Sequence, residues 1–290
     1  MSSTAVVPSF PSLVRGELRK VVRQRSNWLL LSAAVVVGLI AGLVLSTGLA
    51  FHEALLRDPV EWFRGMNVVA FGFITPTLGG IVMLTTSARL VAMEYATGAI
   101  RVILARGPGR LEVLLAKLAA LAALLLGLML VFLLWAVVFA ALMAAANGTS
   151  LAVVRSFPDR YWHDLGVHLT TGAISLFVCA CIGVAAGAVG RSMAFAMGVA
   201  IGFFPAENFL SRVFGIVSGG SNTGFLAQLD TFQLSSNLNV LPETLGHNRE
   251  SLFGRPLASV DAVHSLTLIA VYCAVFITAA FVFSRRDIVE

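Results

Sequence analysis

Six long stretches of this chain carry almost no charged side chain. A helix needs about 20 residues to cross about 30 Å of membrane hydrocarbon. Inside lipid, every backbone amide and carbonyl must be hydrogen-bonded within the protein, and a helix achieves this. The apolar residues do not alternate with a period of two, so the strands of a membrane barrel are not expected. Only 12% of the residues are charged, which leaves too little polar surface for a water-soluble enzyme.

We therefore expect an all-α integral membrane protein that forms a single transmembrane domain over residues 1–290. The third stretch is longer than one span needs, and its helix is expected to project beyond the bilayer. The fifth stretch reaches spanning length only if it continues through Pro205 and Glu207, so a broken or re-entrant helix is expected there. The six expected transmembrane helices cover about 28–50, 66–88, 114–146, 166–189, 192–210 and 262–284.

The positions of Lys and Arg indicate how these helices are oriented, because loops retained in the cytoplasm are enriched in both residues. With six spans and the N-terminus inside, thirteen of the twenty Lys and Arg residues fall on the cytoplasmic side. We therefore expect a multi-pass protein of the inner (plasma) membrane with both termini in the cytoplasm. The pI of about 9.6 follows from this topology, and no nucleic-acid partner is expected.

Residues 12–25, which precede the first span, have the pattern of an amphipathic helix. Apolar residues recur at helical spacing, and cations follow one another at intervals of four. Such an interfacial helix would lie on the cytoplasmic membrane surface with its cations near anionic lipid headgroups. The alternative is that these charges only anchor the first span. The expected membrane-surface residues are Arg15, Arg19, Lys20 and Arg23.

The loop at 89–112 is helical in pattern but too short to be a domain. Its first part can form a short helix, and the Gly-Pro-Gly sequence at 107–109 then forces a turn. We expect a short cytoplasmic helix there, beneath the membrane and between the second and third spans. On the outer side, the 212–261 loop mixes apolar patches with turn-rich sequence, so short helices are expected.

Motifs that would make the chain an enzyme are absent from the sequence. It contains no G-x-x-x-x-G-K-[ST] string, whose backbone amides and lysine would cradle phosphates. It contains neither G-x-S-x-G nor H-E-x-x-H. We therefore expect no catalytic residue, no metal site and no cofactor bound by this chain.

Several features of the apolar stretches have both a functional and a structural explanation. Glu207 either marks a functional site near mid-membrane, where charge is costly, or lies at the outer boundary in water. Pro76 either kinks a pore-lining helix or serves packing alone. Three G-x-x-x-G strings, which begin at Gly38, Gly183 and Gly198, favour close helix contacts within one subunit or between two copies.

The 89–112 loop and the start of the third span carry a spaced pattern of charged, glycine and apolar residues. These residues are Glu94, Thr97, Gly98, Ile100, Arg101, Leu104, Arg110 and Lys117. The pattern resembles the membrane subunit of type 2 ABC exporters, in which E-x-x-x-G-T-[LI]-R-x-x-L precedes a proline turn, an arginine and a lysine. Ala99 here replaces the usual threonine. A basic N-terminal segment with Glu17 and Lys20 and the ending F-S-R-R-D at 283–287 extend the resemblance over the whole chain.

The resemblance implies that the loop forms a coupling helix that docks into a separate ATP-binding cassette ATPase subunit. It implies an exporter built from two permease copies, as a homo- or heterodimer, with two ATPases that use ATP and Mg. Glu94 and Arg101 would be polar docking contacts, and Ile100 and Leu104 apolar ones. The full set of expected coupling residues is Glu94, Thr97, Gly98, Ile100, Arg101, Leu104 and Arg110. The implied substrate pathway lies along spans two and five, with Pro76, Pro205 and Glu207 as candidates.

Two other functions stay open from the sequence. An ATP-independent secondary transporter would have inverted repeats and intramembrane ionisable residues. A membrane anchor or assembly subunit would need only the spans and a docking surface. The arginines of the loop would then only enforce topology, and Glu94 would pair with Arg101 or another loop cation. Because no clear repeat is present and Glu207 is the single ionisable candidate, the ATP-coupled permease is favoured.

Overall fold

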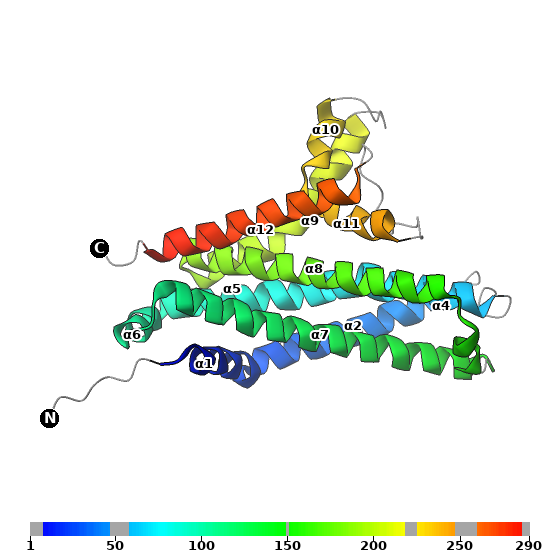
Figure 1. Ribbon diagram of the computed structural model, residues 1–290, viewed down its shortest axis with the longest axis horizontal. Coiled ribbons are helices and arrows are strands. Elements are labelled where there is room, and N and C mark those ends of the chain that lie inside the picture. Colours follow the sequence, from blue (N-terminus) through cyan, green and yellow to red (C-terminus); the bar gives the residue numbers. More distant parts are fainter. Residues whose placement is uncertain (1–7, 47–57, 149–150, 218–224, 247–259, 286–290) are drawn as a thin grey trace.

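The computed structural model describes residues 8–46, 58–148, 151–217, 225–246 and 260–285, and over these residues every regular element is a helix. Among them, five helices are long and apolar enough to cross a membrane, and they run side by side along the longest axis of the molecule (Figure 1). They are α2 (Arg25–Ser46), the composite helix Pro59–Ala96, α7 (Arg110–Ala146), α8 (Asp159–Gly190) and α12 (Ala262–Arg285). The first, second, third, fourth and sixth expected spans fall on these helices.

The fifth expected span falls on α9 (Met193–Val217), which is helical on both sides of Pro205. The expected break is therefore absent, because a proline removes one hydrogen bond from a helix without forcing the chain to turn. Only Met193–Phe203 forms an apolar helix there, and it is shorter than a span, so the count of six spans stays a prediction. The last part of α9 stands out from the bundle together with α10 (Phe225–Thr231) in Figure 1.

The composite helix contains three parts: α4 (Pro59–Asn67), the π-helical η1 (Val68–Gly79) and α5 (Gly80–Ala96). Asp58 is the N-cap residue of the composite helix: its Oδ1 accepts hydrogen bonds from the backbone amides of Val60 and Glu61 at 3.1 and 3.3 Å. Pro76 lies inside η1, where the Thr75 hydroxyl donates to the Ala70 carbonyl at 2.8 Å. Pro76, for which a kinked pore-lining helix and plain packing were both open, thus lies in a stretch of wide π-helix, a form that is frequent at functional sites.

Glycines let α8 pack directly against α5. A Cβ atom added at Gly183 would lie 1.9 Å from Ser87 Oγ, and one at Gly187 would lie 2.8 Å from the Ala88 carbonyl oxygen. Gly42 of α2 similarly faces the Phe139 ring of α7 at 3.1 Å. Two of the three G-x-x-x-G strings therefore serve packing within the subunit. The third begins at Gly198, where no residue that the structure describes lies within 4 Å of an added Cβ.

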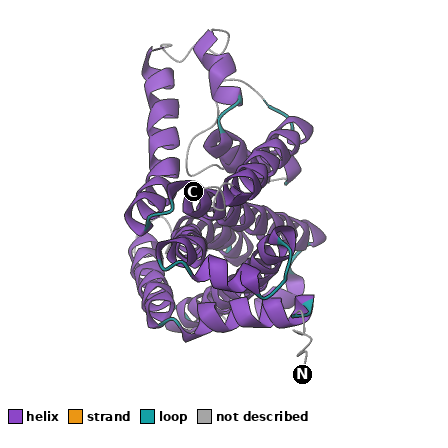
Figure 2. Ribbon diagram, turned by 90° about the vertical axis from the view of Figure 1, so that its left-hand side faces the viewer, coloured by secondary structure: helices purple, strands orange, loops and turns teal. Residues whose placement is uncertain are grey.

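One end of the bundle gathers α1 (Phe10–Arg23), α6 (Ala99–Ala105) and the last turn of α12. Figure 2, which looks at this end, shows α1 running crosswise along the lower edge of the bundle. The Arg110 guanidinium at the start of α7 donates to the Ser284 carbonyl near the end of α12. The expected interfacial helix and the expected loop helix therefore exist as helices and lie at the same end of the molecule.

Candidate functional site

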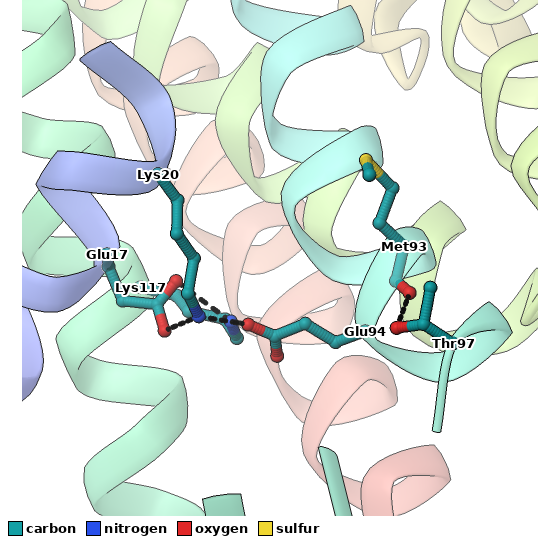
Figure 3. Close-up of polar contacts among 6 residues, drawn as sticks. All are labelled: Glu17, Lys20, Met93, Glu94, Thr97 and Lys117. Atoms are coloured by element: carbon teal, nitrogen blue, oxygen red, sulfur yellow. Dashed lines mark hydrogen bonds and ion pairs between the residues drawn. The ribbon is translucent and has the colours of Figure 1, made fainter. Parts of the chain in front are cut away.

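Four charged side chains form a closed ring at the end of the bundle that carries α6 (Figure 3). Glu17 and Lys20 come from α1, Glu94 from α5 and Lys117 from α7. The Nζ atom of Lys20 lies 2.7 Å from Glu17 Oε1 and 2.5 Å from Glu94 Oε1. The Nζ atom of Lys117 lies 3.0 Å from Glu17 Oε2 and 2.7 Å from Glu94 Oε1. Each charge therefore has two neighbours of opposite sign.

Three members of the ring are almost fully buried. The side chains of Glu17, Glu94 and Lys117 are 7%, 8% and 4% exposed, whereas Lys20 is 43% exposed. Isolated buried ions are costly, so this site is stable only because the two positive and two negative charges balance. Burial by itself lowers the pKa of Lys20, but the attraction of Glu94 and the hydrogen bonds to Glu17 and Glu94 outweigh it, and the pKa lies above its ordinary value.

The ring ties α1 to both helices that flank α6. Glu94 lies in the last turn of α5, just before α6, and Lys117 lies in the second turn of α7, just after it. A displacement of α6 therefore acts on helices that share one ionic contact with α1. A further tie joins α5 to α2, because Arg89 donates to the Ser26 hydroxyl at 2.5 Å.

The expected membrane-surface residues divide between two faces of α1. Arg15, Arg19 and Arg23 are exposed, whereas Lys20 reaches into the ring. The opposite face is buried at Glu17 and Val21. The helix is amphipathic as expected, but its buried face carries an ionic contact as well as apolar residues.

Two glycines shape the loop between α5 and α7. Gly98 has a φ of 69° and Gly107 a φ of 96°, in the left-handed region that favours glycine. Gly98 begins α6, directly after Thr97, whose hydroxyl donates to the Met93 carbonyl at 2.7 Å. These residues of the sequence pattern therefore end α5 and start a new helix in another direction.

The two faces of α6 have different surroundings. Ile100 and Leu104 line a small recess together with Tyr95 of α5 and Val113 of α7. These two residues, which we expected as apolar docking contacts, therefore face the body of the protein. The opposite face is exposed, and its residues are Arg101, Val102, Ala105 and Arg106.

The two expected polar docking residues differ from each other in exposure. Arg101 is exposed on α6, whereas Glu94 is buried in the ring. The partners of Glu94 are Lys20 and Lys117. Sequence reasoning did not foresee this pairing. The available signal was Lys117 itself, a lone cation at the start of an otherwise apolar run.

Two of the candidate pathway residues line one cavity. Pro76 of η1 and Pro205 of α9 border a space of about 240 Å³ between η1, α5, α8, α9 and α11 (Leu234–Leu245). The walls are mainly apolar, for example at Ile81, Leu84 and Leu238. Polar groups are contributed by Thr77, Ser175, Ser235 and Asn239. The structure thus brings together two prolines that are far apart in the sequence.

Glu207, the third candidate pathway residue, caps the start of α11. Its carboxylate accepts hydrogen bonds from the backbone amides of Leu234 and Ser235 at 3.2 and 2.9 Å. A carboxylate at a helix N-terminus satisfies free amides and is favoured by the helix dipole. Because Ser235 also lines the cavity, Glu207 holds one wall of it in place.

A comparison with models of known protein families identifies a family to which the chain is similar. A family model described as "ABC-2 family transporter protein" matches residues 12–288. No curated protein matches this chain. The matched range contains the ionic ring, α6 and the cavity.

Proposed function

Because this chain belongs to the ABC-2 family of transporter proteins, we propose that it is the permease subunit of an ATP-driven exporter and that a separate ATPase docks on α6. The family membership makes it the transmembrane component of an ABC transport system. The observation that carries the finer proposal is the position of α6. This short helix has one exposed face and is anchored on both flanks by the ionic ring.

The exposed face of α6 is suited to a protein partner. Val102 offers an apolar contact, and Arg101 and Arg106 offer donors for carboxylates of the ATPase. Ile100 and Leu104 act on the other side, where they hold α6 against α5 and α7. In this proposal ATP and Mg are used by the partner, and this chain converts the motion of that partner into a motion of its helices.

The ionic ring transmits the motion of α6. ATP binding draws the two ATPases together and pushes on α6, and Glu94 and Lys117 carry this displacement into α5, α7 and α1. Buried charges hold a specific geometry, since any separation leaves an ion unpaired at high cost. The ring therefore makes α1, α5 and α7 respond as one unit.

The cavity beside Pro76 and Pro205 is the proposed start of the export path. It lies between η1 and α9, and η1 is a π-helical stretch whose hydrogen bonds differ from those of the α-helix on either side. A push on α5 from the α6 end reaches η1 directly, because the two are parts of one helix. Cargo would then leave at the end of the bundle opposite α6.

A second permease copy is proposed to pack on α9. One face of this helix carries small, exposed residues at intervals of four. Small residues of this kind let two helix backbones approach closely within a membrane. These residues are Ala194, Gly198, Gly202 and Ala206. A dimer through this face would place the cavities of the two copies near each other, since α9 also borders the cavity.

The proposal is tested by purifying the tagged chain from its native membrane in mild detergent. An ATP-binding cassette protein should co-purify in stoichiometric amount and hydrolyse ATP. Arg101→Glu should lose it, whereas Arg23→Glu, a matched reversal on the exposed face of α1, should retain it. A chain that purifies alone and without ATPase activity would sink the proposal and favour an ATP-independent transporter or a membrane anchor.

A further inference from the structure

A second cavity, which has no part in the proposed export path, lies at the end of the bundle opposite α6. It has a volume of about 410 Å³ and lies between α4, η1, α7, α8 and η2 (Leu151–Ser156). Its walls are mainly apolar and rich in aromatic rings, with Asn67 as a polar member. The aromatic members are Phe63, Phe71, Phe157, Tyr161 and Trp162.

The mouth of this cavity has the residues of a membrane–water boundary. Tyr161 and Trp162 lie in the first turn of α8, and Trp162 is 48% exposed. Such rings gather where the hydrocarbon meets the headgroup layer. Arg155 and Arg160, both exposed, are sequence neighbours of the lining residues Val154 and Tyr161. These residues suit a mouth that opens at the headgroup layer, with the cavity beneath it in the hydrocarbon.

Hydrocarbon fits this cavity better than water does. A buried water needs two to four polar partners, whereas the polar side chains of these walls are Asn67 and Tyr161, which hydrogen-bond to each other. The cavity has the volume of on the order of ten methylene-sized groups, so it can hold part of an acyl chain. On its α7 side the lining residue Val137 is 59% exposed and continues a row of exposed apolar residues that includes Leu130 and Leu134. This row suits the acyl chains of the bilayer.

The charges beside the mouth match a phospholipid headgroup. Arg160 lies 3.6 Å from Glu61, but both side chains are about half exposed, and such a pair contributes little. Arg155 and Arg160 can therefore bind a phosphate through charge-assisted hydrogen bonds. Glu61 and Asp159, which are also exposed, can pair with the amine of a zwitterionic headgroup. Arg64 is less available, since it contacts Glu61 and the buried Asp164.

We propose that this cavity binds one zwitterionic phospholipid, with an acyl chain between α7 and α8 and its phosphate on Arg155 and Arg160. The site requires only that the chain is embedded in a bilayer, and it is independent of the ATPase and of the export path. A lipid held there would bridge α4, α7 and α8 at the end of the bundle that lies farthest from the ionic ring.

The test counts lipids on the purified full-length chain by native mass spectrometry. The protein is delipidated in detergent, incubated with a zwitterionic phospholipid and measured. One lipid should remain on each wild-type chain. Ala140→Phe, which fills the cavity, should lose it, whereas Ala123→Phe, at an exposed position of α7 outside the lining, should keep it. Arg155→Gln with Arg160→Gln should weaken retention by about ten-fold.

A second measurement uses a conservative variant that keeps an aromatic ring in the cavity wall. A phospholipid with a brominated acyl chain, added in detergent, should quench the fluorescence of wild type more than that of Trp162→Phe. The proposal is overturned if wild type retains no lipid, if folded Ala140→Phe retains as much, or if quenching does not depend on Trp162. Loss of a dimer rather than of lipid in Ala140→Phe would also overturn it, because a second copy would then fill the cavity.

Discussion

At the scale of single residues, Lys117 has the largest expected effect, because it is the most buried member of the ionic ring. Lys117→Met should leave Glu17 and Glu94 with only the half-exposed Lys20 as a counter-ion. Removing one partner of a buried pair costs about 3–5 kcal/mol, so the free energy of unfolding should fall strongly. The measurement is the thermal or urea unfolding of the purified variant in detergent.

The control variants follow from the geometry of the ring. Lys20→Met should cost less, since Lys20 is 43% exposed and water can replace part of its role. The double variant Glu94→Gln with Lys117→Met should recover stability, because the remaining Glu17 and Lys20 balance each other. An equal loss in Lys20→Met and Lys117→Met, without recovery in the double variant, would mean that the ring contributes no specific stabilisation.

An aspartate introduced on α6 should have opposite effects on its two faces: loss of the ATPase on the exposed face and loss of stability on the face toward α5 and α7. Val102→Asp changes a side chain that is 58% exposed, so the chain should stay as stable as wild type but lose the co-purifying ATPase. Ile100→Asp places a charge in the recess against Tyr95 and should destabilise the chain itself. Both are read by thermal unfolding and by the amount of ATPase recovered. Retention of the ATPase by Val102→Asp would show that this face is not the docking surface.

At the scale of elements, the contact of α5 with α8 depends on glycine. Gly183→Val would place a Cβ atom 1.9 Å from Ser87 Oγ and 2.8 Å from the Leu84 carbonyl oxygen, so the two helices must move apart. Overpacking of this kind costs about 1–3 kcal/mol, and the melting temperature should fall accordingly. Gly166→Val on the same helix is the control, because among the described residues none lies within 4 Å of its added Cβ. Equal melting temperatures for the two variants would contradict the close packing.

The exposed small residues of α9 carry a second prediction at this scale. Gly202→Leu should separate the proposed dimer into monomers that remain folded, because no described residue lies within 4 Å of a Cβ atom added there. Gly127→Leu is the control, at an exposed glycine of α7 with equally open surroundings. Light scattering of the detergent-solubilised protein gives the molecular mass. A dimer that survives Gly202→Leu must use another face.

At the scale of the whole molecule, the proposed topology predicts which positions are reached from each side of the membrane. Cys179, Cys181 and Cys273 are free and buried, so they are expected to react slowly with a polar maleimide. In sealed right-side-out vesicles, Asp159→Cys at the start of α8 should be labelled at once. Ala105→Cys on α6 should be labelled only after lysis. Labelling of Ala105→Cys in sealed vesicles would invert the orientation.

The long helices could be predicted from the sequence because their cause is local. An uncharged run of sufficient length must be helical in lipid whatever surrounds it. The helix α1 could also be predicted, because its apolar residues recur at helical spacing. The helix α6 could be predicted because Gly98 and the turn at 107–109 bound it. The family resemblance at this loop was also local, and the match over residues 12–288 confirmed it. The fifth span was harder to predict from the sequence, because α9 mixes apolar residues with Pro205 and Glu207.

The candidate site could not be predicted in this way, because its contacts join residues far apart in the chain. Lys20 meets Glu94 across 74 positions, and Lys117 meets Glu17 across 100. The sequence left Glu207 either near mid-membrane or at the outer boundary, and it did not indicate that this carboxylate caps a helix that begins 27 residues later. Which face of α6 is exposed depends on α5 and α7, against which Ile100 and Leu104 pack. The sequence by itself determined a bundle of membrane helices through hydrophobicity, whereas only the tertiary structure decided how its charges pair, because burial makes each ion depend on partners that the local sequence does not contain.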